Sequence, residues 1–237
     1  MLSGGALVIG AALAWFARLP TRWVAAITAF GAGVLVSALS FDLMDEAQRR
    51  GGFGPTAAGF LAGAVVYTAA NIALSRYGAK HRKRSGQQQS DEGGSGTAIA
   101  VGALLDGIPE SVVIGVSLLS GEGVSLVAVA AVFLSNLPEG LASAAGMRKA
   151  GRPAAYVFGI WVGIALLSGL AAMLGALLMA GTGPGAVAFV TAVAAGAILA
   201  MLADTMIPEA FETAHDYAGL ITVLGFLTAF VLTKLGD

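Results

Sequence analysis

The chain has 237 residues, of which 57% are hydrophobic and 11% charged, with 34 glycines and no cysteine. These values exclude an ordinary soluble domain and indicate a protein that crosses a membrane several times. The net charge of −1 gives no reason to expect nucleic acid as a partner, and the lack of cysteine excludes disulfides, thiolate ligands and cysteine catalysis.

Apolar segments of about 20 residues, enough to cross a hydrocarbon core of about 30 Å, recur along the chain between short polar breaks. We therefore predict an all-α membrane protein in which residues 1–237 form one polytopic domain of eight transmembrane helices. The first segment is short but lacks the basic start of a signal peptide, so we interpret it as a retained helix. The predicted spans are residues 2–17, 23–47, 55–76, 97–119, 124–147, 153–179, 184–211 and 217–235.

Lysine and arginine gather in the connections after the first, third and fifth predicted spans. The opposite side holds only Arg49, Arg50 and Lys234 of the 13 basic residues. Positively charged connections stay in the cytosol. Both termini are therefore predicted on the extracytoplasmic side of the cytoplasmic membrane.

The connection of residues 78–96 is basic at first and then rich in Gln, Ser and Gly. This composition is typical of a flexible cytosolic loop, and its basic run is expected to attract lipid headgroups. His81 lies in this loop, but a single histidine in a basic run is a weak indication of a metal ligand.

Residues 33–47 resemble residues 196–210 in glycine position, apolar pattern and the closing Glu-Ala. The similarity predicts a 3+2+3 arrangement, with inverted three-helix repeats around a central helix pair. Transporters built from inverted repeats bind their substrate near the midplane of the membrane.

Two copies of a Pro-Glu motif lie deep in the fourth and fifth predicted spans, at residues 106–111 (DGIPES) and 135–140 (SNLPEG). A glutamate buried in a membrane is costly, so by default it marks a functional site. At a rise of about 1.5 Å per residue, Glu110 and Glu139 both fall near the middle of the bilayer.

In each copy a polar residue precedes the glutamate by four positions, and side chains four residues apart share one face of a helix. Asp106 pairs in this way with Glu110, and Ser135 with Glu139. Three carboxylates in one place repel each other unless protons or a cation neutralise them. A divalent cation is the simplest partner.

A proline stands between the two polar positions of each copy, Pro109 in the first and Pro138 in the second. Proline lacks an N–H, so each one releases a backbone carbonyl one turn back and bends the helix. Released carbonyls are useful where a cation is coordinated or passes.

Further acids occur outside the central pair. Asp42 precedes Glu46 by four residues, and Asp204 lies close to Glu209. We interpret these four as lining a path to or from the site. The alternative, helix-end acids at the membrane surface, applies most directly to Glu46, and His215 in the last connection is expected to be exposed.

At the residues of the two motifs the chain resembles the ZIP family of divalent-metal transporters. The resemblance covers nearly the whole chain: eight spans, external termini, a long cytosolic loop after the third span, and Pro-Glu motifs in the fourth and fifth. The family pattern in the fourth span is His-Asn-x-Pro-Glu-Gly. Here Asp106 takes the place of the histidine and Gly107 that of the asparagine.

The resemblance implies a metal site in which Gly107 and Ser168 replace ligands that hold a second metal in other family members, so we expect one metal site. Ligation by oxygen alone favours Mn²⁺ or Fe²⁺ relative to a histidine-containing site, while Zn²⁺ and Cd²⁺ remain open. The expected ligands are Asp106, Glu110, Ser135, Asn136 and Glu139.

The resemblance further implies transport by alternating access, without covalent chemistry and without a permanently bound cofactor. Spans one, four, five and six would move against a scaffold of spans two, three, seven and eight. The partners are then metal ions and membrane lipids, and family members are often dimers.

Three other functions are weighed. A proton- or cation-coupled carrier of a small organic solute would use the same acids as a proton relay. An intramembrane metal hydrolase would need a motif such as His-Glu-x-x-His, and no predicted span contains a histidine. A structural or sensor protein gives no reason to keep charges at the midplane.

Overall fold

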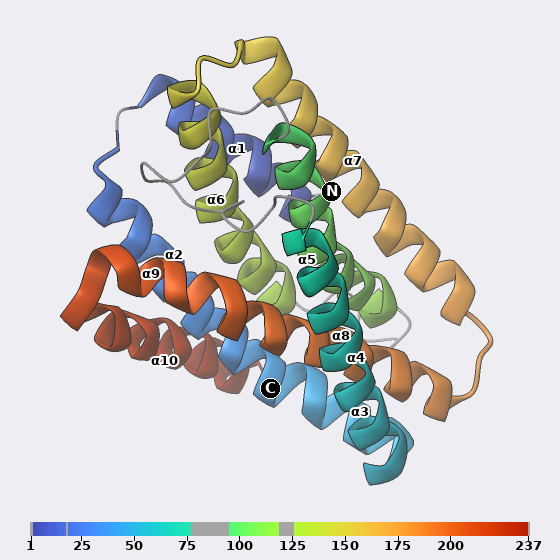
Figure 1. Ribbon diagram of the computed structural model, residues 1–237. Coiled ribbons are helices and arrows are strands. Elements are labelled where there is room, and N and C mark those ends of the chain that lie inside the picture. Colours follow the sequence, from blue (N-terminus) through green and yellow to red (C-terminus); the bar gives the residue numbers. More distant parts are fainter. Residues whose placement is uncertain (1, 18, 77–94, 119–125, 237) are drawn as a thin grey trace.

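The computed structural model describes residues 2–17, 19–76, 95–118 and 126–236, and these residues form helices joined by short connections (Figure 1). This confirms the all-α fold class for the described part of the chain. The predicted loop of residues 78–96 lies almost entirely outside it. The main helical elements are α1 (Leu2–Phe16), α2 (Thr21–Ala38), η1 (Leu39–Leu43), α3 (Met44–Gly51), α4 (Phe53–Leu74), α5 (Ser95–Ser117), α6 (Leu126–Lys149), α7 (Ala154–Met179), α8 (Pro184–Met201), η4 (Leu202–Met206), α9 (Ile207–Ala214) and α10 (Ala218–Gly236).

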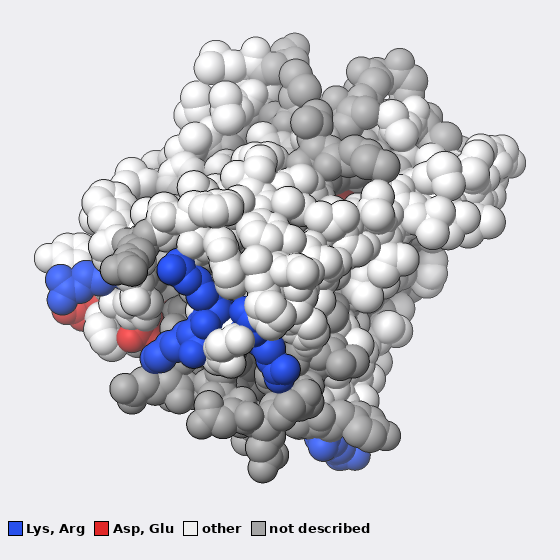
Figure 2. Space-filling view, turned by 90° about the horizontal axis from the view of Figure 1, so that it is seen from above, with Lys and Arg blue, Asp and Glu red and all other residues white. Residues whose placement is uncertain are grey.

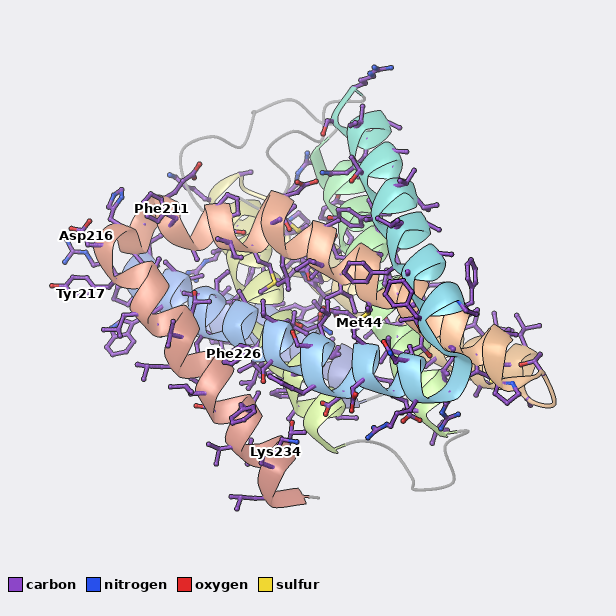
Figure 3. The ribbon with its side chains drawn as sticks, turned by 90° about the horizontal axis from the view of Figure 1, so that it is seen from below. Met44, Phe211, Asp216, Tyr217, Phe226 and Lys234 are labelled. Atoms are coloured by element: carbon purple, nitrogen blue, oxygen red, sulfur yellow. The ribbon has the colours of Figure 1, made fainter. Side chains whose placement is uncertain are left out.

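Four helical runs among the described residues are long and apolar enough to cross a membrane, which indicates a multi-pass membrane protein. The last run is too long for one crossing, since about 20 residues suffice. The chain reverses within it at His215, whose φ is 42°. Figure 3 shows Asp216 and Tyr217 at this turn and Lys234 near the far end of α10. The runs are Thr21–Gly51, Phe53–Leu74, Ala154–Met179 and Pro184–Leu235.

The helices differ in how much of their surface is covered. In the most apolar window of the run that contains α2, 67% of the residues are buried, against 17% in the windows of α4 and α7. Leu166, Leu170 and Leu177 of α7 are all exposed. A continuous apolar face of this kind is unfavourable in water and suits contact with lipid. The long run of α2 therefore lies inside the protein, and α4 and α7 lie at its edge.

Two helices are interrupted by a π-helical turn at matching positions. In the first, η1 begins at Leu39, six residues after Gly33; in the second, η4 begins at Leu202, six residues after Gly196. Both lie in the segments whose sequences resemble each other. A π-helical turn inserts one residue into an α-helix and often marks a functional region.

Glycines bring α2 and α10 into backbone contact. A methyl group at Gly33 would overlap the carbonyl oxygen of Thr222, and one at Gly225 would overlap that of Phe30. Only glycine fits at such positions, because the helices touch through their backbones.

The same arrangement joins α4 and α8. A methyl group at Gly196 would overlap the carbonyl oxygen of Phe60, and one at Gly63 would overlap that of Val193. The two similar sequence segments thus make equivalent glycine contacts with different partner helices.

A second set of contacts involves the central helices. Gly140 of α6 packs against the carbonyl oxygen of Leu7 in α1, and Gly115 of α5 packs against that of Ala172 in α7. Each central helix is therefore tied at its backbone to one outer helix, α6 to α1 and α5 to α7.

Candidate functional site

The site is built around two carboxylates of α5. The side chains of Asp106 and Glu110 are only 1% and 2% exposed, and they lie one turn apart on the same helix. Their spacing of four residues puts them on one face, as the sequence predicts. Two acids at this depth are thus closed off from the surroundings in this conformation.

Both carboxylates accept hydrogen bonds from hydroxyl groups of neighbouring helices. Tyr67 of α4 donates its hydroxyl to Asp106 Oδ1 at 2.7 Å. Ser135 Oγ of α6 lies 3.1 Å from Glu110 Oε1 and 2.9 Å from the carbonyl oxygen of Val132, so its single hydrogen serves one of these acceptors at a time. The site therefore joins α4, α5 and α6.

Both hydroxyl donors are neutral, so they leave the charge of a carboxylate in place. Moving a charge from water into a protein interior costs several kcal/mol even after relaxation, and a like charge one turn away adds to that cost. The arrangement of Asp106 and Glu110 is therefore suited to a cation or to protons.

The fifth-span motif contributes differently. Ser135 and Asn136 of α6 are buried, whereas Glu139 is only partly buried. Within the described residues, no group of three or more His, Cys, Asp or Glu side chains is close enough to hold a metal ion. The three-acid set therefore stays a prediction, and Ser135 is an α6 residue in contact with Glu110.

The packing glycines have the same spacing to Ser135 as to Glu110. Glu110 precedes Gly115 by five residues, and Ser135 precedes the equivalent Gly140 by five. Glu139 immediately precedes Gly140, about one helical turn further along. The two motifs are equivalent in sequence but displaced by one turn in packing.

Both motif prolines lie inside continuous helices, Pro109 in α5 and Pro138 in α6. Pro138 releases the carbonyl of Leu134 from the helix hydrogen-bond ladder. That carbonyl oxygen lies against Gly31 of α2, where a methyl group would come within 2.9 Å of it. The released carbonyl thus lies at the contact between α6 and α2.

Gly107, which stands where the family pattern has a ligand asparagine, lies close to a residue of α7. A methyl group at Gly107 would lie 3.3 Å from Ser168 Oγ of α7, and Ser168 is buried. The two residues expected to replace the ligands of a second metal therefore lie together, and neither carries a charge. The number of metal sites stays a prediction.

The chain is 28% identical over 209 residues to an Arabidopsis thaliana protein described as a putative zinc transporter. This chain is its distant homologue. The match covers 87% of the chain and 33% of the relative, so the chain spans about a third of the length of the curated protein it matches. No protein-family model matches the chain. The homology is consistent with the ZIP membership that the motifs predict.

The outer acids fall into two pairs at the π-helical turns. Asp42 lies in η1 and is partly buried, and Asp204 lies in η4 and accepts a hydrogen bond of 3.3 Å from Asn71 Nδ2 of α4. Glu46 forms ion pairs with Arg49 and Arg50 in its own helix, which agrees with the helix-end alternative.

Glu209 and the two histidines complete the residues singled out in the sequence. Glu209 is partly buried in the first turn of α9. His215 is exposed at the turn before α10, as predicted. His81 lies outside the described residues.

Sequence reasoning missed two polar residues of α4. Tyr67 and Asn71 are one turn apart, and they donate hydrogen bonds to Asp106 and Asp204 respectively. The signal was present, because a tyrosine or asparagine within an apolar span usually needs a hydrogen-bond partner when buried. The two acids that they contact are both among the predicted site residues.

Proposed function

We propose that the protein transports a divalent transition-metal ion across the cytoplasmic membrane. The observation that carries the proposal is the buried pair Asp106 and Glu110, which faces Ser135 across the contact between the central helices. The distant homology to a zinc transporter supports the same function. The metal is the substrate, and no covalent chemistry is involved.

The ligands proposed are the five oxygen-bearing residues of the two motifs. Asp106 and Glu110 supply the charge in this conformation, and Ser135 and Asn136 add neutral oxygens. Glu139, one turn from Ser135 on α6, adds a third carboxylate. Zn²⁺, Fe²⁺, Mn²⁺ and Cd²⁺ fit this oxygen set to different degrees, with the harder ions favoured.

The glycine contacts support a two-part mechanism with eight spans in a 3+2+3 arrangement. Backbone contacts join α1 to α6 and α5 to α7, and also α2 to α10 and α4 to α8. The first four helices would form the moving bundle and the second four the scaffold. Movement between the parts exposes the site to each side of the membrane in turn, with both termini outside the cytosol.

A hydrogen bond crosses the boundary between the proposed parts. Tyr67 belongs to a scaffold helix, and its acceptor Asp106 belongs to the moving bundle. Any large displacement of α5 along α4 must break this bond. Tyr67 is therefore a positioning residue that holds the site in the closed conformation.

The proposal is tested with purified protein in proteoliposomes loaded with a metal-sensitive dye. The parent protein is expected to carry Mn²⁺, Fe²⁺, Zn²⁺ or Cd²⁺ inward, and Glu110→Gln is expected to abolish the flux because one of the two buried charges is lost. Glu212→Gln serves as the control, since Glu212 is exposed near the end of α9. Equal flux through parent and Glu110→Gln would refute the assignment.

Thermal unfolding in detergent separates metal transport from the carriage of an organic solute. Micromolar Mn²⁺ or Cd²⁺ should stabilise the parent protein, since a ligand that binds the folded state raises its stability. An organic-solute carrier that uses the acids as a proton relay should not respond to these metals.

A further inference from the structure

A cavity of about 320 Å³ lies where α1, α2 and α6 meet, away from the buried carboxylates. Most of its lining residues are apolar, among them Ala14 of α1, Val24 of α2 and Leu141 of α6, but its surface also contains polar groups. The volume is at the lower end of the range of about 300–1,000 Å³ that small-molecule sites occupy. The lining therefore suits an amphipathic ligand, with an apolar part against the aliphatic side chains and a polar part against Thr21 and the basic residues.

The rim of the cavity carries positive charge. Arg148 and Lys149, in the last turn of α6, are its charged lining residues. No carboxylate among the described residues forms an ion pair with either of them. Figure 2 shows lysine and arginine side chains gathered on the face that includes this end of α6. The site thus combines an apolar interior with a cationic mouth.

Arg148 is held in place at this mouth. Its guanidinium Nη1 donates to the carbonyl oxygens of Ala14 and Trp15 at the end of α1, at 3.2 and 2.6 Å, and the group lies over the Trp15 ring. These contacts explain Arg148 as a cap for α1. Lys149 is exposed and makes none of these capping contacts with α1.

We propose that this cavity binds one anionic phospholipid, with its phosphate at Lys149 and Arg148 and the start of an acyl chain between α1, α2 and α6. Charge complementarity and the mixed lining, aliphatic side chains beside basic ones, carry the proposal, together with the predicted cytosolic position of this end, where anionic lipids attract basic residues. It depends on the membrane location of the protein and not on metal transport.

The test measures the thermal unfolding midpoint of the full-length protein in detergent during titration with dioleoylphosphatidylglycerol or dioleoylphosphatidylcholine. The anionic lipid should stabilise saturably and the zwitterionic lipid should not. Lys149→Ala should raise the half-saturating lipid concentration about fivefold, the factor that one basic residue contributes at an anionic surface. Lys234→Ala removes an exposed lysine of α10 and should change nothing.

Two further arms complete the test. Ala17→Leu narrows the cavity from the connection after α1 without altering charge, and it should weaken the phosphatidylglycerol effect. Inorganic phosphate alone should not reproduce that effect; if it does, the ligand is a free anion and the lipid assignment is wrong. Equal responses to the two lipids, or equal half-saturation in Lys149→Ala and Lys234→Ala, would also overturn it. Metal uptake plays no part in these readouts.

Discussion

The central helices α5 and α6 carry the same Pro-Glu motif, yet they bring different groups to the site. α5 buries Asp106 and Glu110 one turn apart, whereas α6 meets Glu110 with the hydroxyl of Ser135. Glu139, the counterpart of Glu110 in the motif, lies one turn beyond this contact. Residue type is therefore repeated between the helices, while position in the packing is not.

The cause of this difference is the spacing of two kinds of residue. Pro109 and Pro138 are 29 residues apart, whereas the packing glycines Gly115 and Gly140 are 25 apart. The difference of four residues is about one helical turn. The site is asymmetric because the counterpart of Asp106 in α6 is Ser135, which contacts Glu110.

The largest expected effect separates the two motif glutamates. Glu110→Gln should lower the affinity for Mn²⁺ or Cd²⁺ by at least about 100-fold, since even an outer-shell partner of a metal site is worth about 10–100-fold. Glu139→Gln should lower it less, because Glu139 lies outside the buried pair. Isothermal titration calorimetry in detergent measures both affinities. Equal losses would mean that the motif, and not the packing, defines the site.

The next largest effect is expected from loss of the hydrogen bond that Tyr67 of α4 donates to Asp106 of α5. Tyr67→Phe should reduce metal affinity about tenfold, because an outer-shell hydrogen bond that orients a ligand typically contributes about 10–100-fold. Tyr217→Phe, at an exposed tyrosine, is the matched control. Calorimetry with Mn²⁺ distinguishes the two variants. An unchanged affinity in Tyr67→Phe would show that Asp106 needs no orientation by α4.

A smaller loss is expected on the α6 side. Ser135→Ala should weaken metal binding about fivefold, the equivalent of one net hydrogen bond of about 1 kcal/mol. Ser143→Ala, a buried serine of the same helix, serves as the control. If both variants bind metal as the parent does, α6 contributes no ligand at Ser135.

The smallest effect on metal binding is expected at the glycines that set the offset. Gly115→Ala and Gly140→Ala keep every ligand but force the helices apart, so they should weaken metal binding by less than Ser135→Ala and destabilise the protein by about 1–3 kcal/mol each, the usual cost of overpacking. Gly159→Ala has free space around it and should be neutral. Thermal unfolding compares the three. A large difference in stability between Gly115→Ala and Gly140→Ala would show that the two glycines are not equivalent.

Much of the fold follows from the sequence, because a membrane span needs a long apolar segment and such segments are visible without a structure. The helices accordingly lie in the predicted ranges. The π-helical turns were not predicted. Leu39 and Leu202 begin them, and no residue type there distinguishes a π-helical turn from an α-helical one.

The candidate site was only partly predictable. The four-residue spacing of Asp106 and Glu110 fixes their common face, so their proximity could be foreseen. The register of α6 against α5 depends on backbone contacts with two other helices, which no local motif encodes. Tyr67 was missed for a related reason, since its acceptor lies 39 residues away in the chain.

The paired π-helical turns also bear on how the chain came to be. An extra residue rotates everything after it by about 100° around the helix axis, so inserting one is a drastic change. Its presence at the same place in both similar segments fits the inverted repeat that the sequence predicts. Asp42 occupies the fourth position of η1, whereas Asp204 occupies the third position of η4. The two turns thus match in position along the similar segments, whereas the acids within them do not.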